Sequence, residues 1–430
     1  MKILWLVNII MPELAINLNR SVSVFGGWLT GAMKAVKESG NELVICTTEP
    51  DTKDQGKYDI NGVRYYICAR DGIASMREDF REILNTEKPD VVHVYGTEFE
   101  HSLAMTQVSD KRITVVTIQG ALVYYKENVF AGLPEKSCKD NIIHKLMRML
   151  NKGGKSIQLQ KNSYDNRALA EKAILESIKY INGGSEWGNA VGLSINPDAK
   201  TFDCGLILRD SFYCDERWSA ETCEKHSIYI LHSYPIKGFH KFLEALKIVV
   251  KKYPDTKVYV VANRISYRHY GRLKNAIMNV APDYDWIVQQ IIEENNLQEY
   301  IISVGYISET EVKERMLKSN VFVSASSIEN QSTTLGEAMI LGVPSVASCV
   351  GAIQEMIDDG VDGFIYPFNE PYMLADKIIR VFEDEELAKQ FSQKGHEHAA
   401  RTYNRETNCR RLLEMYDTIV NNVEENTNDF

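Results

Sequence analysis

Short apolar runs alternate with amphipathic helical patterns along most of this chain, and no other sequence feature constrains the fold as strongly. Apolar runs of strand length, separated by longer patterns with apolar residues three or four positions apart, predict alternating strands and helices. This order is typical of a parallel sheet with right-handed helical crossovers. The predicted strands form two groups, at 3–9, 42–47, 90–96, 113–120 and 180–183, and at 227–233, 257–263, 300–306, 321–327, 344–349 and 363–368.

The two groups of strands predict two domains. A chain of 430 residues exceeds the size at which one hydrophobic core keeps growing. We therefore expect an α/β protein with a Rossmann-like domain at 1–210 and a second at 227–404, joined by a polar linker at 211–226. In open parallel sheets, ligands bind beyond the carboxyl ends of the strands, so an interlobe cleft between the facing loops is the expected site.

Composition excludes some functions and favours a location. A net charge of −10 argues against a general nucleic-acid binder, because affinity for phosphate backbones comes from clustered Lys and Arg. Eight dispersed cysteines without a C-x-x-C pair predict reduced thiols in a cytoplasmic protein. The apolar N-terminal run lacks the small-residue cleavage site of a signal peptide, and no later run is long enough to span a bilayer.

Two glutamates eight positions apart, Glu329 and Glu337, flank the start of a predicted helix. The apolar run at 321–327 predicts a buried strand, and the residues from Ser332 to Thr334 can cap the helix that follows. The unpaired N–H groups and positive dipole end of a helix N-terminus attract phosphate. The arrangement suits a phosphorylated, polyhydroxylated ligand.

A Lys-Gly pair follows the first strand of the second half. Lys237 precedes Gly238, where the helical pattern FHKFLEALKIVV begins. Its ammonium group could meet a diphosphate at that helix start, although a solvated lysine at the start of a helix is an equal alternative from local sequence. Gly26 and Gly27 open the first long helix and would allow the backbone to approach the phosphate groups of a ligand closely, yet such turns occur wherever a loop meets a helix.

Three motifs in this order carry a resemblance to a known family: YPIKG at 234–238, Glu329-x7-Glu337 with the continuation EAMILGVPSVAS, and VGAIQEMIDDGVDGFIYP at 350–367. They resemble the nucleotide-sugar-binding lobe of family 4 glycosyltransferases, retaining enzymes of the GT-B fold. Segments such as HVYGTEFEHSLAM (93–105) and TIQGALVYY (117–125) resemble a subgroup involved in bacterial surface-polysaccharide assembly. The resemblance implies an acceptor sugar attached to a carrier lipid.

The resemblance also implies roles for individual residues. Lys237 would receive the donor diphosphate, and Glu337 would accept hydrogen bonds from the ribose. Glu329 would lie against the transferred sugar, either positioning its hydroxyls or stabilising developing positive charge, and these two roles stay open. A final helix at about 405–423 would pack back on the first lobe. The remaining donor-binding residues implied are Gly26, Gly27, Ser332, Thr333, Thr334 and Leu335.

Several residues depart from the family pattern. His232 stands where many relatives have an Arg, and an imidazole is a poorer diphosphate clamp than a guanidinium group. Gln119 replaces a His near the sugar, so it can hydrogen-bond a hydroxyl but cannot act as an acid or base. Gly184, Gly188 and Leu206 also replace residues usual in the closer subgroup. These changes bear on the sugar and the acceptor rather than on the fold.

Polar residues after a strand of the first half are candidates for the acceptor site. Glu98 and His101 follow the strand at 90–96 and could face the acceptor, whereas His93 lies within the strand and is expected to be packed. Asp283-Tyr284-Asp285 matches a metal-binding Asp-x-Asp, but it precedes a helical pattern and is better interpreted as an N-cap. No metal and no cofactor are expected.

A basic amphipathic stretch at 136–172 is a candidate for peripheral membrane contact. Lysines and arginines alternate there with apolar residues such as Ile142 and Leu146, while acids are few. This combination suits an interfacial helix against anionic lipid, and an ordinary surface helix is an equal alternative.

The sequence thus predicts a retaining, metal-independent glycosyltransferase with a UDP- or GDP-sugar donor and a saccharide acceptor. It would act in the cytoplasm, with a peripheral contact at the inner face of the membrane. One alternative is a sugar-nucleotide epimerase of the same fold, which Gln119 weighs against because it cannot titrate. Another is a catalytically weak sugar-nucleotide-binding subunit, which the replacements at His232 and Gln119 keep open.

Overall fold

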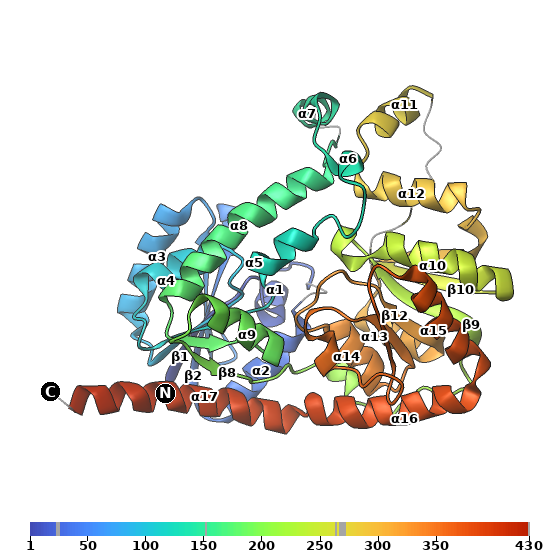
Figure 1. The fold of residues 1–430 in the computed structure, drawn as a ribbon. Helices are drawn as coiled ribbons and strands as arrows, with labels where there is room; N and C mark the ends of the chain where they lie inside the picture. Colours follow the sequence, from blue (N-terminus) through green and yellow to red (C-terminus); the bar gives the residue numbers. More distant parts are fainter. Residues whose placement is uncertain (23–25, 151–152, 263–264, 266–271, 429–430) are drawn as a thin grey trace. The chain divides into compact units, whose positions relative to one another are not determined.

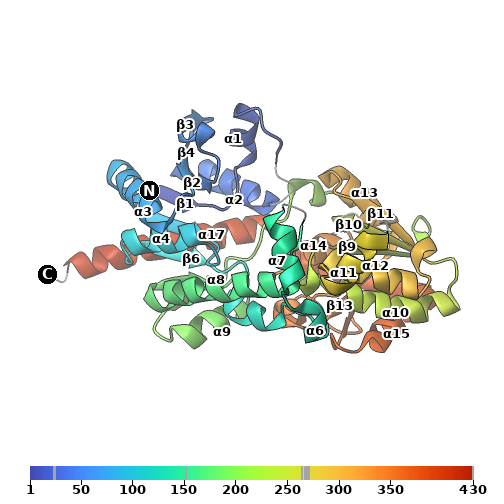
Figure 2. The same cartoon turned by 90° about the horizontal axis from the view of Figure 1, so that it is seen from above.

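The structure is a computed structural model that describes residues 1–22, 26–150, 153–262, 265 and 272–428. It divides into two compact units, each with its own sheet (Figures 1 and 2). The first unit contains residues 1–123, 166–210 and 402–430, and the second contains residues 124–165 and 211–401. The two units are described separately.

The first unit is built on an eight-stranded sheet in the order β3-β4-β2-β1-β5-β6-β7-β8. Its strands pair in parallel except for β3 and β4, and the central strands are almost fully buried, as expected for a sheet covered on both faces. The strands are β1 (Lys2–Leu6), β2 (Glu42–Glu49), β3 (Gly56–Ile60), β4 (Val63–Ala69), β5 (Val91–Tyr95), β6 (Thr114–Thr117), β7 (Tyr180–Asn182) and β8 (Lys200–Phe202).

The hairpin of β3 and β4 was missing from the predicted strands, as was the short edge strand β8. The turn between β3 and β4 is Asn61-Gly62, with φ angles of 50° and 80°. Positive φ at both central residues is typical of a tight hairpin turn, and Asn-Gly is its strongest sequence signal. The signal is therefore present in the sequence, where it marks an antiparallel hairpin rather than a strand followed by a helix.

Helices of the first unit include a pair, α3 and α4, that lie side by side, while α2 contacts α17 (Figure 2). The C-terminal helix α17 contacts β5, and the hydroxyl group of its Tyr416 accepts a hydrogen bond from Trp5 Nε1 at 2.9 Å and lies 2.7 Å from His93 Nδ1. The helices are α1 (Pro12–Asn17), α2 (Gly27–Glu38), α3 (Ile73–Glu87), α4 (Glu100–Val108), α8 (Ile157–Ser177, which begins in the second unit), α9 (Glu186–Ile195) and α17 (Arg405–Asn428).

The second unit has a six-stranded, fully parallel sheet in the order β11-β10-β9-β12-β13-β14. The chain order reverses direction between β9 and β12, which is the kind of switch point beside which ligands bind in open α/β sheets. The strands are β9 (Glu224–His232), β10 (Lys257–Ala262), β11 (Ile301–Gly305), β12 (Ser319–Ser324), β13 (Ser345–Ser348) and β14 (Phe364–Tyr366).

Helix α10 of the second unit contacts α12 and α15 on one side of the sheet, and α13 and α14 contact the strands β9, β12 and β13 (Figure 1). The α-helices of this unit are α5 (Leu122–Tyr125, which begins in the first unit), α6 (Glu135–Cys138), α7 (Ile142–Met149), α10 (Phe239–Lys252), α11 (Arg272–Val280), α12 (Tyr284–Glu294), α13 (Glu309–Lys318), α14 (Thr333–Ile340), α15 (Pro371–Glu383) and α16 (Glu385–Thr402).

Two parts of the chain differ from the predicted domain boundaries. Residues 124–165 were assigned to the first domain, but they group with the second unit. The predicted linker at 211–226 contains Trp218, which is buried and whose indole N–H donates to Ser319 O at 2.7 Å. The polar composition of 211–226 predicts an exposed linker. The single buried indole ring and its hydrogen bond nevertheless attach this stretch to the second unit.

The eight cysteines are free, and five are buried; the closest pair is Cys46 and Cys68, with sulfur atoms 3.8 Å apart. Across the described residues, none of the helices has both the length and the apolar character needed to cross a membrane.

The Tyr416 hydroxyl should stabilise the first unit through the two groups that it bridges. Tyr416→Phe leaves the buried Trp5 N–H without its acceptor, so we expect the free energy of unfolding to fall by about 1–3 kcal/mol. Urea denaturation followed by tryptophan fluorescence measures the change. Asp417→Asn, an exposed neighbour on the same helix, is the control, and equal stability of the two variants would contradict the prediction.

Candidate functional site

The turn after β9 is held close to the loop after β12. Lys237 ends a short 3-10 helix (Pro235–Lys237), and Gly238 follows with φ of 66°. A Cβ atom at Gly238 would lie 1.7 Å from the carbonyl oxygen of Ala325, so only glycine fits. Ser327 N donates to Ile236 O at 2.7 Å. The turn thereby places Lys237 against the loop that carries Glu329.

Lys237 and Glu329 form an ion pair through Nζ and Oε1, and Ser326 Oγ donates to the same carboxylate oxygen at 2.8 Å. Burial disfavours the charged form of Lys237, but the Glu329 carboxylate outweighs it and raises the pKa of the ammonium above its ordinary range. A cavity of about 20 Å³, lined in part by both residues and Ser332, has room for one water molecule. The pair therefore brings a fixed cation and a fixed anion to the carboxyl end of β12.

The helix N-terminus predicted between the two glutamates is present at α14. Ser332 is its N-cap and accepts a hydrogen bond from Leu335 N at 3.3 Å, which confirms the predicted cap. Thr333 and Thr334 form the first turn and are half-exposed, whereas Leu335 is buried. Glu337 lies in the second turn and is only 3% exposed. A buried carboxylate needs hydrogen-bond donors, and this one lies a turn away from the helix start.

His232, at the end of β9, is buried, and its Nε2 lies 3.3 Å from Asp285 Oδ1. The ring also packs near Phe239 and Tyr284. The neighbouring Asp283 accepts from Trp286 N at 2.9 Å and caps α12, which confirms the N-cap interpretation of Asp283-Tyr284-Asp285. His232 therefore lies beside an acidic side chain, Asp285.

In the first unit, two of the predicted acceptor residues meet at the carboxyl ends of β5 and β6. A Cβ atom at Gly96 would lie 2.9 Å from Glu98 Oε2 and 3.1 Å from Gln119 Oε1, so the glycine admits both side chains. Gln119 Oε1 accepts from Asn8 Nδ2 at 3.2 Å. Among the described residues, Glu98 Oε2 is buried without a hydrogen-bond partner. A buried polar atom of this kind is a candidate ligand contact.

Glu98 belongs to a buried pair of carboxyl groups. Burial raises the pKa of Glu98 to about 8, and the Glu171 carboxylate contributes to the rise. Burial also raises the pKa of Glu171 to about 7, although hydrogen bonds from Thr97 Oγ1 and Val123 N lower it. Arg167 Nε donates to Glu98 O at 2.7 Å. At neutral pH, Glu98 is therefore mainly a neutral acid that can donate a hydrogen bond to a hydroxyl group.

The two histidines of this region are both buried and neutral. Burial lowers the pKa of His101 to about 3, with smaller contributions from Arg70 and Arg167, and His101 Nδ1 lies 3.1 Å from Thr48 Oγ1. His93 is packed as predicted, with Nε2 2.6 Å from Thr117 Oγ1, and burial lowers its pKa to about 3. His101 can hydrogen-bond a ligand, but it cannot hold a proton near neutral pH.

Gly26 and Gly27 begin α2 as predicted. Gly26 is the N-cap with φ of 76°, and a Cβ atom there would lie 2.3 Å from Ile9 Cδ1. At Gly27, a Cβ atom would lie 2.6 Å from Arg209 Cγ. The positive φ favours glycine at position 26, and a side chain at position 27 would have to displace the side chain of Arg209.

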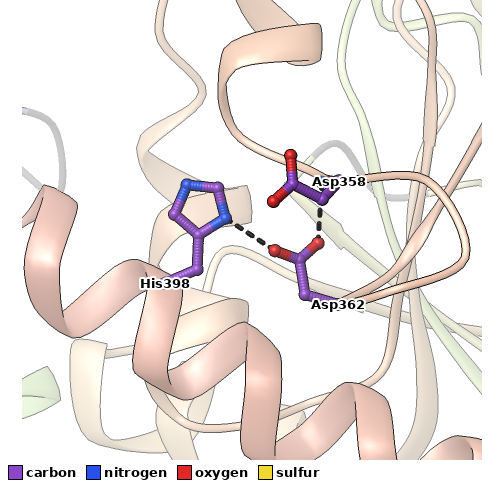
Figure 3. Close-up of side chains that lie close together, drawn as sticks. All are labelled: Asp358, Asp362 and His398. Carbon is purple, nitrogen blue, oxygen red and sulfur yellow. Dashed lines mark hydrogen bonds and ion pairs between the residues drawn. The ribbon is translucent and has the colours of Figure 1, made fainter.

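One cluster of candidate metal ligands occurs in the described part of the chain, formed by Asp358, Asp362 and His398 (Figure 3). Asp362 accepts a hydrogen bond from Asp358 N at 2.8 Å through Oδ1, and His398 Nδ1 lies 2.6 Å from its Oδ2. Both oxygens of the buried carboxylate thus have partners within the protein. These contacts attach the turn at 358–362 to α16, so interactions within the protein explain why the three side chains lie together.

Each unit therefore collects its own set of predicted residues: Lys237, Glu329 and the start of α14 in the second, and Glu98 and Gln119 in the first. The sequence interpretation missed Glu171 as a partner of Glu98. Ala168 and Ile174 flank Glu171 on the buried face of α8. Its spacing from these apolar residues was the available signal for a buried carboxyl group.

Residues 217–398 match the sequence family described as "Glycosyl transferases group 1". A stretch of 253 residues, 58% of this chain, is 24% identical to the poly(ribitol-phosphate) alpha-N-acetylglucosaminyltransferase of Staphylococcus aureus (strain COL). It covers 46% of that protein, so the chain spans about half of this relative's length. The alpha-monoglucosyldiacylglycerol synthase of Acholeplasma laidlawii is 22% identical over 393 residues, 89% of this chain and 90% of that relative.

Two solved structures resemble the whole chain. Sucrose-phosphate synthase from Thermosynechococcus elongatus has a TM-score of 0.68 at 16% identity and covers 97% of this chain and 99% of its own. Anabaena HepE in complex with UDP-glucose has a TM-score of 0.63 at 12% identity and covers 99% of this chain and 100% of its own. At these identities the likeness shows the fold, which is the predicted fold with two Rossmann-like sheets.

The pKa of Glu98 gives the stability a specific pH dependence. Its folded pKa of about 8 lies above the ordinary 4.5, so between these values the unfolded chain has released a proton that the folded chain keeps. Stability contributed by this group is therefore complete below about pH 4.5 and is lost as the pH rises towards 8.

Glu98→Gln removes the titrating group. The free energy of unfolding of this variant, relative to that of wild type, should therefore rise by more than about 1 kcal/mol between acidic and mildly alkaline pH. Urea denaturation at a series of pH values measures this. The control is Glu100→Gln, an exposed neighbour. A stability difference that is independent of pH would show that Glu98 is ionised in the folded protein.

Proposed function

We propose that the protein transfers a sugar from a nucleotide diphosphate to a saccharide acceptor, because residues 217–398 match the group 1 glycosyl transferase family and the chain has the GT-B fold. The observation that carries the proposal is the Lys237–Glu329 pair beside the N-terminus of α14. A diphosphate needs cations and N–H donors, and a sugar needs a hydrogen-bond acceptor. Both are present at the end of β12.

Each charged side chain of the site would interact with a different part of the donor. As the glycosidic bond breaks, negative charge grows on the leaving diphosphate, and the Lys237 ammonium together with the first N–H groups of α14 would stabilise it. Glu329 would accept hydrogen bonds from the transferred sugar or stabilise its developing positive charge. Glu337, one turn into α14, would bind the ribose hydroxyls. Retention of configuration and independence of metal ions are part of this proposal.

UDP- and GDP-sugars are the donors that we expect, with a hexose as the transferred sugar. HepE was crystallised with UDP-glucose, and the staphylococcal relative is named for transfer of N-acetylglucosamine to poly(ribitol-phosphate). Together with the sequence resemblance, these names favour a role in surface-polysaccharide synthesis. The acceptor would then be a saccharide attached to a carrier lipid.

A carrier-linked acceptor would bring the chain to the cytoplasmic face of a membrane, and α7 is the element suited to that contact. Four large apolar residues, Ile142, Leu146, Met149 and Leu150, are 78%, 53%, 82% and 56% exposed. They recur at intervals of four, three and one residue, so they form one stripe along the helix and its C-cap. Soluble proteins seldom expose contiguous apolar surface of this kind.

Polar contacts hold α7 with this stripe outward. Asn141 and His144 form a capping box, and His144 is fully buried with Nε2 3.2 Å from Pro282 O. Arg148 forms two hydrogen bonds with the Asp140 carboxylate, at 2.8 and 2.7 Å. The side of α7 that packs on the protein is therefore its polar side, in contrast to an ordinary amphipathic surface helix.

The charge around α7 favours an anionic lipid surface as its partner. Residues 136–161 contain seven Lys or Arg and one Asp, a net charge of +6 in a chain of net charge −10. Lys136, Lys145 and Lys155 are exposed and form no ion pair among the described residues. Each lysine close to an anionic bilayer contributes about 1 kcal/mol to binding. Arg167, within the predicted stretch of 136–172, contacts Glu98 and Phe99 instead, so the contact that we propose is limited to residues 136–161.

Transfer should depend on both members of the charged pair. We expect Lys237→Ala and Glu329→Gln each to lower kcat by about 10²–10³, because each removes an interaction with charge that develops in the transition state. Lys251→Ala, an exposed lysine on α10, is the control. The assay measures transfer from donors chosen by thermal shift across UDP-, GDP- and ADP-sugars.

The same assay separates the alternative functions. A sugar-nucleotide epimerase would convert the donor without an acceptor, and a binding subunit would be stabilised by nucleotide sugars without turnover. A lack of stabilisation by every nucleotide sugar would contradict the proposal as a whole.

Membrane contact should require the apolar stripe. We expect the wild type to co-sediment with vesicles of equal parts phosphatidylcholine and phosphatidylglycerol, and Ile142→Ser/Met149→Ser to lose at least about tenfold in apparent affinity. Leu169→Ser, which changes a 68% exposed residue on α8, is the matched control. If the wild type does not bind the vesicles, lipid is not the partner of this face. The same follows if the wild type is a dimer and the double variant is a monomer.

A further inference from the structure

Besides the contacts with the turn at 235–238, the loop that carries Glu329 is held from two further directions. Within the strand framework of the second unit, Glu329 O accepts from Ala352 N at 3.0 Å. Gly351 approaches so closely that a Cβ atom there would lie 1.9 Å from the same carbonyl oxygen. These contacts fix the backbone of Glu329 on the side of β13. They leave the neighbouring residues 327 and 330 to be held by other parts of the chain.

Residues 124–131 supply the second direction. Tyr125 Oη accepts a hydrogen bond from Asn330 N at 2.6 Å, and Ser327 Oγ donates to Asn128 O at 3.1 Å. One contact lies two residues before Glu329 and the other lies one residue after it. The pair of contacts therefore brackets the carboxylate-bearing residue on its backbone.

This segment is itself anchored independently of the loop. His240 Nε2 lies 2.8 Å from Ala131 O, and the buried His240 ring lies 3.0 Å, through Nδ1, from Tyr284 Oη. At Gly132, with φ of 77°, a Cβ atom would lie 2.9 Å from Lys241 Cε. The segment 124–131 is thus attached to His240 of α10, which is held in turn by Tyr284 of α12, so it can restrain the loop rather than follow it.

We propose that Tyr125 is a positioning residue for glycosyl transfer, because its hydroxyl group fixes the backbone beside Glu329. The inference rests on the proposed function for the role of Glu329. A hydroxyl is needed because the buried N–H of Asn330 requires an acceptor. A carboxylate that must follow charge developing on a sugar is sensitive to small displacements, since misplacement by about 1 Å can cost 10²-fold in rate.

Tyr125→Phe tests the inference, because it keeps the ring and removes only the acceptor oxygen. We expect kcat to fall by about tenfold or more, with the KM for the donor changed by less than about twofold, since the diphosphate contacts of Lys237 are left in place. In a double-mutant cycle, Tyr125→Phe should add little to Glu329→Gln, because both act through one carboxylate. Tyr372→Phe, at a residue 57% exposed on α15, is the control.

A lowered melting temperature with unchanged kcat would overturn the inference, as would full additivity with Glu329→Gln. Ser327→Ala removes the hydrogen bond to Asn128 O and leaves Tyr125 unchanged, so it should also lower kcat, but by less. Hydrogen exchange keeps the test independent of turnover. Tyr125→Phe should speed exchange of the amides at 327–332 even if no donor is ever turned over, and unchanged exchange there would refute the positioning contact by itself.

Discussion

The close backbone approach between the turn at 235–238 and the loop at 325–332 is the constraint on which the candidate donor site depends. Gly238 allows the Ala325 carbonyl oxygen to occupy the space that any side chain would fill. With the backbones this close, the Lys237 ammonium reaches the Glu329 carboxylate. The site is therefore a property of main-chain packing first and of charge second. A larger residue at 238 would separate the two charges without altering either of them.

Much of the second unit could be predicted because its signals are local. Strands with continuous apolar runs, a Lys-Gly turn and a Ser-Thr-Thr cap each depend on a few adjacent residues, and the structure places β9, β12 and α14 close to the predicted ranges. The missed features depend on distant partners. Trp218 lies in the predicted linker, and its acceptor, Ser319 O, lies 101 residues further along the chain, beyond the reach of any local signal.

In the first unit, the candidate residues at the carboxyl ends of β5 and β6 also depend on distant partners that the local sequence does not show. Glu98, His101 and Gln119 could be selected as residues that follow strands, but their electrostatic character could not. Burial together with Glu171, which lies on a helix far along the chain, gives Glu98 a high pKa, and burial beside two arginines gives His101 a low one. The shifts run in opposite directions: a carboxyl group that retains its proton lies three residues before an imidazole that has lost its own. Sequence reasoning chose the residue types, and the fold determines their protonation.

The grouping of residues 124–165 with the second unit means that neither unit is one continuous stretch of chain. The backbone passes between the units near residues 123, 165, 210 and 401. A graft of the second unit onto another chain would have to respect these four crossings. Here a graft of 211–401 alone would leave behind Tyr125, Asn128 and Ala131, the residues that cover Asn330, Ser327 and His240. The compact unit that holds the candidate donor site is therefore discontinuous in sequence, and a graft that keeps its internal contacts must include residues 124–165.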